Sequence, residues 1–485
     1  MSKDAIKNLK PELLWEAFFG ISQVPRPSKK EEKIQKHVQD WAERNNFEFK
    51  TDDSGNILIY VPATPGYEDK PTVVLQGHLD MVCEKNKGTE HDFENDPIEL
   101  IKEGDWLKAN GTTLGADNGI GVAASMAIAL DKNTVHGPLE ILCTADEETG
   151  MTGVNGLSSD FLKGKYLLNL DSEEDGVFYV GCAGGQDTVG RAEIKFKTND
   201  TDLVPYELMV TGLAGGHSGL DIQNGRANAI RLLAILLNRL DVKFKIAEMS
   251  GGSLRNAIPR EAEAVILIDP TDETKVKDVI DKFVSDMLLE FKVTDGGLKV
   301  NFTKLDKKFD KVFSKKFAKK VINVLLAVPH GIMAMSPSIP DLVETSTNLA
   351  TLRIEDDELV IGTSQRSSIE SAKLVVTSRV VAIFKLAGFE AKVGDGYPGW
   401  QPNMDSQLLK IGKKVYKDMF GSDPGIKAIH AGLETGLLGA KYPDLDMISF
   451  GPTIMGAHSP TEKVNIPAVE KFYNLLNGML KELAS

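Results

Sequence analysis

The stretch Gln76-Gly77-His78-Leu79-Asp80-Met81-Val82 decides how the rest of the chain is interpreted. It follows the apolar run at residues 73–75, which is typical of the end of a buried strand. Because side chains two residues apart on a strand point the same way, His78 and Asp80 leave the strand on one face. A metal-binding histidine needs an acceptor for its second ring nitrogen, and a nearby carboxylate can supply it. The stretch therefore indicates a metal ligand with its support, although an H-x-D pattern alone is common.

The bulk composition is typical of an acidic protein with more than one domain. At 485 residues the chain exceeds the size of one ordinary core, so we expect at least two domains. The formal net charge of −14 argues against a nucleic-acid partner or a membrane partner. The first residues lack the apolar core of a signal peptide, and no apolar run approaches the roughly 18 residues of a membrane helix. Cys83, Cys143 and Cys182 are typical of free thiols in a reducing compartment, so we expect a cytoplasmic protein.

In the first part of the chain, helices alternate with apolar strands that end in acids or a histidine. The strand expected at 72–76 leads to His78 and Asp80, the one at 139–144 to Glu147 and Glu148, and the one at 166–170 to Asp171. This pattern predicts an α/β fold with an open, mostly parallel sheet. Sites in such sheets form beyond the carboxyl ends of the strands, so we expect these side chains to meet at one edge.

The pattern changes after about residue 186 and returns near residue 393. Between these points we expect an α+β unit with helices at 225–240, 273–289, 314–326 and 368–386. We therefore predict a catalytic domain formed by residues 1–186 and 393–485, with residues 187–392 inserted as a second domain. The polar segment 84–104 is expected to be a surface loop with little regular structure.

The loop histidines and acids together form a chemically complete set for metal binding. Of the eight histidines, four lie in glycine-rich or acid-rich loops: His78, His217, His430 and His458. Taken singly, an acid such as Asp117 also suits a turn or a helix N-cap. Two histidines and three carboxylates suit a pair of zinc-like ions with one shared ligand. Glu147 is then a spare carboxylate that can take a proton from a water activated by the metal.

Two other motifs point to different chemistry but fail on their context. Residues 119–124 match a dinucleotide fingerprint, yet the preceding residues 108–117 are polar and turn-rich instead of forming a strand. Residues 215–219 place a serine beside a histidine but lack the G-x-S-x-G spacing of a serine hydrolase. We therefore expect neither a dinucleotide-binding enzyme nor a serine hydrolase.

From about residue 10 to its end, the chain resembles the M20 family of co-catalytic zinc peptidases. Within that family it is similar to the aminoacyl-histidine dipeptidases, also called Xaa-His or cytosol non-specific dipeptidases. The motifs that carry the resemblance occur in one order along the chain, at residues 76–82, 111–121, 147–148, 169–174, 212–219, 254–260, 397–402 and 430–434. So many matches in one order make the resemblance highly specific.

The resemblance implies a metal site with two Zn²⁺ per subunit, for which Co²⁺ or Mn²⁺ could substitute. His78, Asp117 and Asp171 would hold one ion, and Asp117, Glu148 and His458 would hold the other. Asp80 would orient His78, and Glu147 would act as general base and then as general acid. The residue after the bridging acid is Asn118, and the family has a cis peptide bond at this point.

The resemblance also implies a reaction and a partner. The inserted domain would be a lid that carries a homodimer contact, and His217 would stabilise the oxyanion in its own or a partner's active site. Asn256 and Arg366 would contact the substrate's terminal carboxylate or carbonyl. The implied reaction is hydrolysis of small unblocked dipeptides, including β-alanyl-histidine and other Xaa-His substrates, by metal-activated water.

Two alternatives stay open at this point. A deacylase or amidohydrolase would use the same residues on N-acyl amino acids, and it would not need a free amino group in its substrate. A non-catalytic binding protein could keep the fold, but it would have no use for the proton shuttle of Asp80 and Glu147.

Overall fold

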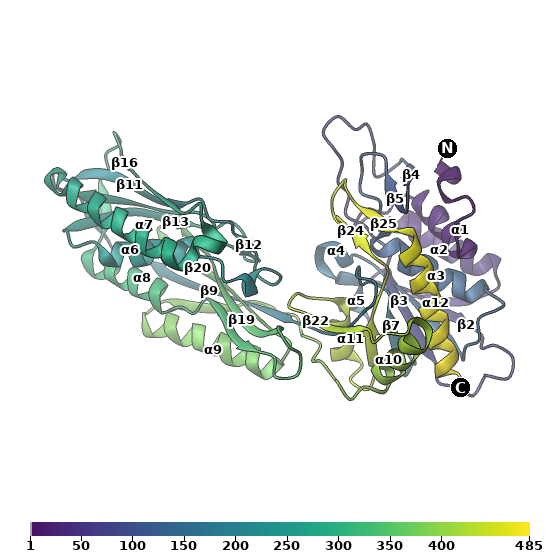
Figure 1. Ribbon diagram of the computed structural model, residues 1–485. Helices are drawn as coiled ribbons and strands as arrows, with labels where there is room; N and C mark the ends of the chain where they lie inside the picture. The colour runs from purple at the N-terminus through teal and green to yellow at the C-terminus, as the bar shows by residue number, and fades with distance from the viewer. Residues whose placement is uncertain (1) are drawn as a thin grey trace. The chain divides into compact units, whose positions relative to one another are not determined.

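The computed structural model describes residues 2–485, and the chain divides into two compact units. The first unit comprises the residues up to Gly181 together with Pro402–Ala428 and Leu433–Ser485. The second unit comprises Cys182–Gln401 and Ile429–Gly432. Residues 187–392, which the sequence predicts to be inserted, lie within the second unit. Each unit is built around a sheet of its own (Figure 1).

The first unit is built on an eight-stranded sheet with the order β1-β2-β6-β3-β7-β23-β8-β22, which ends at β8 (Val177–Cys182) and β22 (Gly425–Ile429). The four central strands pair in parallel: β6 (Leu139–Thr144), β3 (Val73–His78), β7 (Tyr166–Asn169) and β23 (Asp446–Ser449). Towards one edge, β2 (Ile57–Val61) and β1 (Glu48–Thr51) continue the sheet in antiparallel pairing. Every residue of β3, β6 and β7 is buried, as expected for apolar strands in a sheet covered by helices. The predicted α/β class is confirmed.

Helices accompany this sheet along the chain. They are α1 (Glu12–Ser22), α2 (Glu32–Arg44), α3 (Ala116–Leu130), the short α4 (Glu147–Gly150) and α5 (Thr152–Gly156), α10 (Gln407–Phe420), α11 (Glu434–Lys441) and α12 (Ile466–Leu483). In α2, the buried side chains Ile34, Val38, Trp41 and Ala42 recur at helical spacing, as the sequence predicts. α3 is buried from its first residue to Ile128, because its alanines and glycines let it approach its neighbours closely.

A small four-stranded sheet corrects one sequence prediction. Its order is β24-β25-β5-β4, formed by β24 (Ile454–Met455), β25 (Lys463–Asn465), β5 (Trp106–Ala109) and β4 (Leu100–Glu103). The expected loop at 84–104 therefore ends in a strand, which the mixed polarity of residues 100–103 hides in the sequence. Because β25 pairs with β5, the segments that carry His458 and Asp117 are brought side by side.

The second unit contains a large antiparallel sheet with the order β16-β11-β15-β13-β19-β20-β9-β21, and β18 pairs with β19. Its strands are β9 (Gly184–Glu193), β11 (Val204–Thr211), β13 (Phe244–Gly251), β15 (Ala262–Ile268), β16 (Lys299–Lys304), β18 (Gly331–Met335), β19 (Val343–Glu355), β20 (Glu358–Ser367) and β21 (Glu390–Val393). Its main helices are α6 (Ala229–Arg239), α7 (Glu273–Asp295), α8 (Lys315–Ala327) and α9 (Glu370–Leu386). All four helices contribute to one buried apolar cluster with the sheet.

None of the helices formed by residues 2–485 has the length and apolar character needed to cross a membrane.

Candidate metal centre

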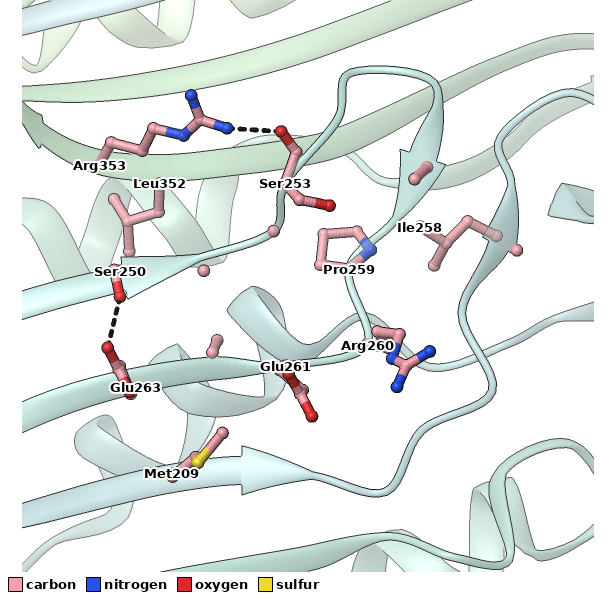
Figure 2. Close-up of a pocket in the computed structure, with 15 residues that line it drawn as sticks. Met209, Ser250, Ser253, Ile258, Pro259, Arg260, Glu261, Glu263, Leu352 and Arg353 are labelled. Atoms are coloured by element: carbon pink, nitrogen blue, oxygen red, sulfur yellow. Dashed lines mark hydrogen bonds between the residues drawn. The ribbon is translucent and has the colours of Figure 1, made fainter. Parts of the chain in front are cut away.

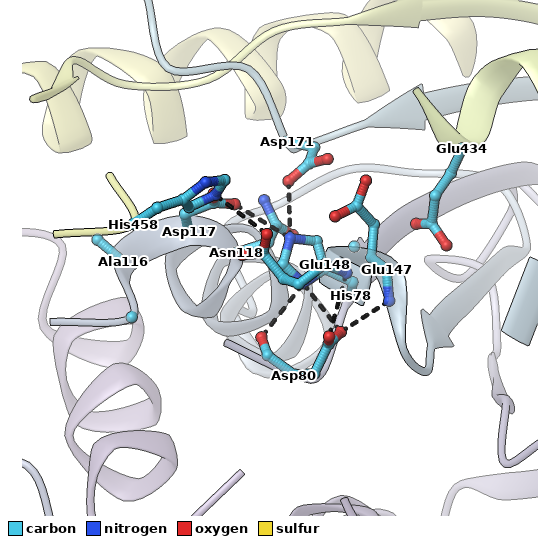
Figure 3. A network of polar contacts seen from close by, with 12 residues as sticks. His78, Asp80, Ala116, Asp117, Asn118, Glu147, Glu148, Asp171, Glu434 and His458 are labelled. Atoms are coloured by element: carbon cyan, nitrogen blue, oxygen red, sulfur yellow. Dashed lines mark hydrogen bonds and ion pairs between the residues drawn. The ribbon is translucent and has the colours of Figure 1, made fainter. Parts of the chain in front are cut away.

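The carboxyl ends of three parallel strands bring five predicted site residues together. His78 is the last residue of β3, and it lies in register with Thr144, the last residue of β6. Glu147 and Glu148 follow β6 at the start of α4, and Asp171 follows β7. Figure 3 shows these side chains, together with Asp80, gathered at one edge of the sheet. The sequence predicted that these side chains would meet beyond the carboxyl ends of the strands, and the structure places them there.

Asp117 lies between the two predicted histidine ligands. Its Oδ1 is 3.0 Å from His78 Nε2, and its Oδ2 is 3.1 Å from His458 Nε2. One more acid approaches the same ring nitrogen of each histidine, with Asp171 Oδ1 at 3.3 Å from His78 Nε2 and Glu148 Oε2 at 3.0 Å from His458 Nε2. Asp117 is thus common to two groups of three ligand atoms, which is the arrangement that a bridging carboxylate requires.

The local backbone around these ligands is unusual. Asp117 and Asn118 have non-helical torsion angles inside the first turn of α3, and the peptide bond between them is cis, as the resemblance implies. His458 adopts a φ of 61°, a left-handed conformation that is uncommon for residues other than glycine. Left-handed backbone at a residue other than glycine is frequent at functional sites.

Asp80 is fully buried and serves several neighbours at once. Its Oδ1 accepts a hydrogen bond from the backbone N–H of Glu147 at 3.0 Å, and its Oδ2 accepts one from Glu148 at 3.2 Å. Ser28 Oγ donates to Oδ2 at 2.7 Å, and His78 Nδ1 lies 3.3 Å from Oδ1. Burial alone would raise the pKa of Asp80, but these contacts lower it to about 2. Asp80 therefore stays ionised and orients both His78 and the turn that carries Glu147 and Glu148.

The donor set fits divalent cations. Among the described residues, Glu148 Oε1 and Asp171 Oδ1 are buried oxygens that make no hydrogen bond. Hydrogen bonds to Asp117 and Glu148 raise the pKa of His458 to about 11. Burial alone would lower the pKa of His78, but the surrounding carboxylates raise it well above its usual range. The carboxylates therefore favour positive charge at this cluster, which a bound cation would also supply. Two imidazoles and three carboxylates are ligands that Zn²⁺ accepts, so the cluster is suited to hold such ions.

Glu147 has the properties of an acid–base group. Burial raises its pKa well above the usual range of a glutamate. The charge of His78 opposes this rise, while the negative charges of Asp171, Glu434 and Glu148 add to it. A carboxyl group with a raised pKa holds a proton more readily than an ordinary glutamate, which suits a group that takes up a proton and then returns it.

Sequence reasoning missed four charged residues that surround the cluster: Arg26, Glu173, Glu434 and Glu462. Glu434 accepts hydrogen bonds from Gln76 Nε2 at 2.6 Å and Thr144 Oγ1 at 2.8 Å. Burial raises the pKa of Glu434, and that of Glu173, to about 8. For Glu434 and Glu173 the sequence signal was their position in a motif, because Glu434 closes the motif at 430–434 and Glu173 lies in the motif at 169–174.

The three remaining predicted site residues lie in the second unit. Arg366 on β20 donates to Ser218 Oγ at 3.3 Å and to Tyr397 Oη at 2.9 Å. His217 Nδ1 accepts from the backbone N–H groups of Gly219 and Leu220, so its Nε2 carries the hydrogen. Burial and the charge of Arg366 lower the pKa of His217, which keeps the ring neutral.

The loop of Asn256 lies beside that of His217. The backbone carbonyl of Asn256 accepts a hydrogen bond of 2.7 Å from the N–H of Ser218, and its side chain is exposed. His430, which the sequence left without a role, pairs its Nε2 with Ser346 Oγ at 2.7 Å. Burial, followed by the charge of Arg366, lowers the pKa of His430 to about 3, so His430 is a neutral hydrogen-bonding group.

A separate pocket of about 570 Å³ lies on the second unit (Figure 2). Its lining includes Gly216 and Ala257, which belong to the short β12–β14 pair (Gly216–His217 and Ala257–Ile258). Two of its polar groups are satisfied internally, because Ser250 Oγ donates to Glu263 and Arg353 to the carbonyl of Ser253. None of the metal-cluster residues lines this pocket.

A family model described as peptidase family M20/M25/M40 matches residues 74–482. The chain belongs to this family. It is 39% identical over 482 residues to the cytosol non-specific dipeptidase of Escherichia coli, with 99% of each chain covered. It is also 39% identical to the aminoacylhistidine dipeptidase of Vibrio alginolyticus, whose crystal structure covers 99% of both chains with a TM-score of 0.92. The aminopeptidase PepT of Bacillus cereus shares the fold, with 16% identity, 98% and 100% coverage, and a TM-score of 0.57.

These comparisons confirm the resemblance that the sequence motifs carry. As a member of an M20 peptidase family, the chain is a hydrolase of the metallopeptidase type. Its ligand-like residues cluster in groups that could hold metal ions.

Proposed function

We propose that this M20 peptidase is a two-metal dipeptidase that hydrolyses unblocked dipeptides, including Xaa-His and β-alanyl-histidine. One observation carries the proposal: Asp117 lies between His78 and His458, with Glu147 beside them as a carboxyl group of raised pKa. The names of the Escherichia coli and Vibrio alginolyticus relatives support the dipeptide substrate. The name of the former also supports a cytosolic location.

The residues fit two Zn²⁺ ions per subunit, for which Co²⁺ or Mn²⁺ could substitute. His78, Asp117 and Asp171 would hold one ion, and Asp117, Glu148 and His458 the other. When bound, such ions supply Lewis-acid charge that polarises a peptide carbonyl and makes water more acidic.

The protein's own groups then move one proton. Glu147 accepts a proton from the attacking water as the water oxygen bonds to the peptide carbon. The same carboxyl group returns the proton to the leaving amine nitrogen when the C–N bond breaks. Asp80 holds the backbone of Glu147 in place throughout, through the N–H of that residue.

The second unit supplies the substrate contacts in this proposal. The Nε2–H of neutral His217 is a donor suited to the oxyanion. Arg366 and Asn256 would contact the terminal carboxylate or carbonyl of the dipeptide, and the guanidinium of Arg366 can bind both carboxylate oxygens. This unit, predicted as residues 187–392, would act as the lid.

We further propose that the lid carries a homodimer contact. Apolar side chains on α9 are exposed, with Leu374 at 51%, Val375 at 67% and Leu386 at 89%. Burying exposed apolar side chains of this kind against a second copy of the chain would remove them from water. Sedimentation velocity should give twice the monomer mass, and Val375→Glu should return the protein to a monomer.

A dipeptide panel with and without a chelator tests the function. The panel should contain β-alanyl-histidine, other Xaa-His and Xaa-Gly dipeptides, and the N-acetyl form of each. We expect cleavage of the unblocked peptides only, loss of cleavage with the chelator, and recovery on adding Zn²⁺. Cleavage of N-acetyl amino acids alone would instead identify an amidohydrolase.

A pair of variants separates catalysis from mere binding. Glu147→Ala should abolish cleavage and still bind metal, whereas Glu470→Ala, at an exposed position on α12, should behave as the unaltered protein. Equal inactivity of the metal-loaded protein and Glu147→Ala on the whole panel would show that the chain is a binding protein.

A further inference from the structure

Glu462 makes an unusual set of contacts with the backbone before Asp117. It is a buried carboxylate, 2% exposed, in the same loop segment as His458. Its two oxygens accept hydrogen bonds from four consecutive backbone N–H groups: Leu114 at 2.7 Å, Gly115 at 2.9 Å, Ala116 at 2.8 Å and Asp117 at 3.3 Å. No side chain of the segment itself caps the start of α3, so Glu462 takes that role from a distant part of the chain.

Arg26 holds the same turn from its other side. Arg26 is 3% exposed, and its guanidinium donates to the backbone carbonyls of Leu79 at 2.9 Å and Asp80 at 2.7 Å. The second guanidinium nitrogen donates to the carbonyl of Gly115. The N–H of Gly115 therefore binds Glu462, while its C=O binds Arg26.

These contacts join three of the segments that carry the metal ligands. Arg26 binds the backbone that follows His78, and Glu462 lies in the segment of His458. Both converge on the turn that leads into Asp117, whose two oxygens must face both histidines at once. A small rotation of this turn would move Asp117 away from one ring or the other.

We propose that Arg26 and Glu462 are positioning residues that hold Asp117 between His78 and His458, and so set the affinity of the metal centre. The inference rests on the proposed function, because it takes Asp117 as a bridging ligand. A capping role alone would affect only the stability of α3. A positioning role must also change how tightly and in what geometry the metal is bound.

Glu462→Gln is the most direct test, because the amide keeps one acceptor oxygen but presents an NH₂ group to N–H donors. Zn²⁺ affinity is measured by competition with a chromophoric chelator, and ligand geometry by the visible absorption spectrum of the Co²⁺ form. We expect Zn²⁺ binding to weaken by about 10–100-fold. The Co²⁺ spectrum should change, while the far-UV circular dichroism of the metal-free protein stays the same.

Three further variants complete the design. Glu470→Gln makes the same chemical change at an exposed site and should bind Zn²⁺ as the unaltered protein does. Glu462→Asp keeps the charge and should recover part of the lost affinity. Arg26→Lys keeps the charge but loses the forked donor, and should weaken metal binding in the same direction; it also tests the proposal if Glu462→Gln does not fold.

Failure of the positioning role can be distinguished from failure of the proposed dipeptidase function. If the folded Glu462→Gln and Arg26→Lys variants bind Zn²⁺ with unchanged affinity and Co²⁺ spectrum, and only melt earlier, the two residues are structural caps and the inference fails. If the unaltered protein binds metal but cleaves no dipeptide, the proposed function fails, while the affinity comparison still decides the positioning role.

Discussion

Asp80 connects several parts of the candidate site. It binds the backbone of both Glu147 and Glu148 as well as Ser28 and the ring of His78. The sequence predicted only the contact with His78, since a short H-x-D spacing reveals a neighbour on the same strand face. The contacts with the turn after β6 depend on the pairing of β3 with β6, which a local pattern does not encode.

Asp80→Ala should therefore impair activity more than stability. We expect kcat/KM for a dipeptide to fall by about 10–100-fold, because His78 and Glu147 lose their support. The free energy of unfolding should fall by about 1–3 kcal/mol, because buried N–H groups lose their acceptor. Steady-state kinetics and urea denaturation measure the two effects. Asp278→Ala, at an exposed position on α7, is the control, and full activity of Asp80→Ala would refute the assignment.

Gly115 is the second residue whose identity the structure explains. Its φ is 68°, and a Cβ atom there would lie 2.4 Å from Arg26 Nη2 and 2.9 Å from Met81 Sδ. Gly115→Ala should destabilise the protein by about 2 kcal/mol or more, from left-handed strain together with overpacking. It should also weaken Zn²⁺ binding, because Arg26 is displaced.

Gly421→Ala is a matched control for this change. Gly421 has a φ of 75° but nothing within 4 Å of an added Cβ, so it shares the strain without the clash. We expect Gly421→Ala to lower the free energy of unfolding by about 1 kcal/mol and to leave metal binding unaltered. Equal effects of the two substitutions, measured by thermal unfolding and chelator competition, would contradict the account.

At the scale of elements, strand ends were the predictable part of the site. Apolar runs ending in His78, Glu147 and Asp171 indicate buried parallel strands, and the structure places these ends together. Arg26 and Glu462 were not predictable, because their partners are backbone groups distant in the chain. The β4–β5 pair was missed for a different reason, because both strands are short and β4 buries only its first residue, Leu100.

His330 links three elements of the second unit. Its Nδ1 accepts from Asn228 Nδ2 at 3.3 Å, at the N-terminus of α6, and from the N–H of Leu349 on β19 at 3.4 Å. Burial, together with the charge of Arg231, lowers the pKa of His330 from 6.5 to about 3. The neutral ring is therefore part of the folded structure.

The stability of this unit should consequently fall as the pH drops below about 6.5. Between pH 6.5 and pH 3 the unfolded chain binds a proton at this histidine and the folded chain does not, so acid favours unfolding. Between pH 7.5 and pH 5 this single group should cost about 2 kcal/mol. His330→Asn keeps a hydrogen-bond acceptor but does not titrate. Between pH 7.5 and pH 5 this variant should therefore lose about 2 kcal/mol less stability than the unaltered protein. Amide hydrogen exchange in β19 measures it, and identical pH profiles of the two proteins would refute the claim.

At the scale of the whole molecule, the candidate metal ligands come from positions as far apart as His78 and His458, yet all lie in the first unit. The order of motifs along the chain allowed the family and the fold to be predicted. Composition and periodicity alone indicated two domains, but they did not reveal that the small sheet of β24, β25, β5 and β4 joins the segments of Asp117 and His458.

Metal removal should therefore act on one unit only. Burial raises the pKa of Glu147, Asp171 and Glu173, and the like charges of neighbouring acids add to it, so these carboxylates destabilise the metal-free fold. Zn²⁺ at about 1,000 times its Kd should stabilise the first unit by about 4 kcal/mol per site. Hydrogen exchange with and without a chelator should show faster exchange in β3 and β6 and no change in β11 and β15. A His458→Ala variant should show a smaller response to the chelator, because one group of ligands is incomplete. Equal responses of both sheets, or none in the first, would exclude a stabilising metal centre at this position.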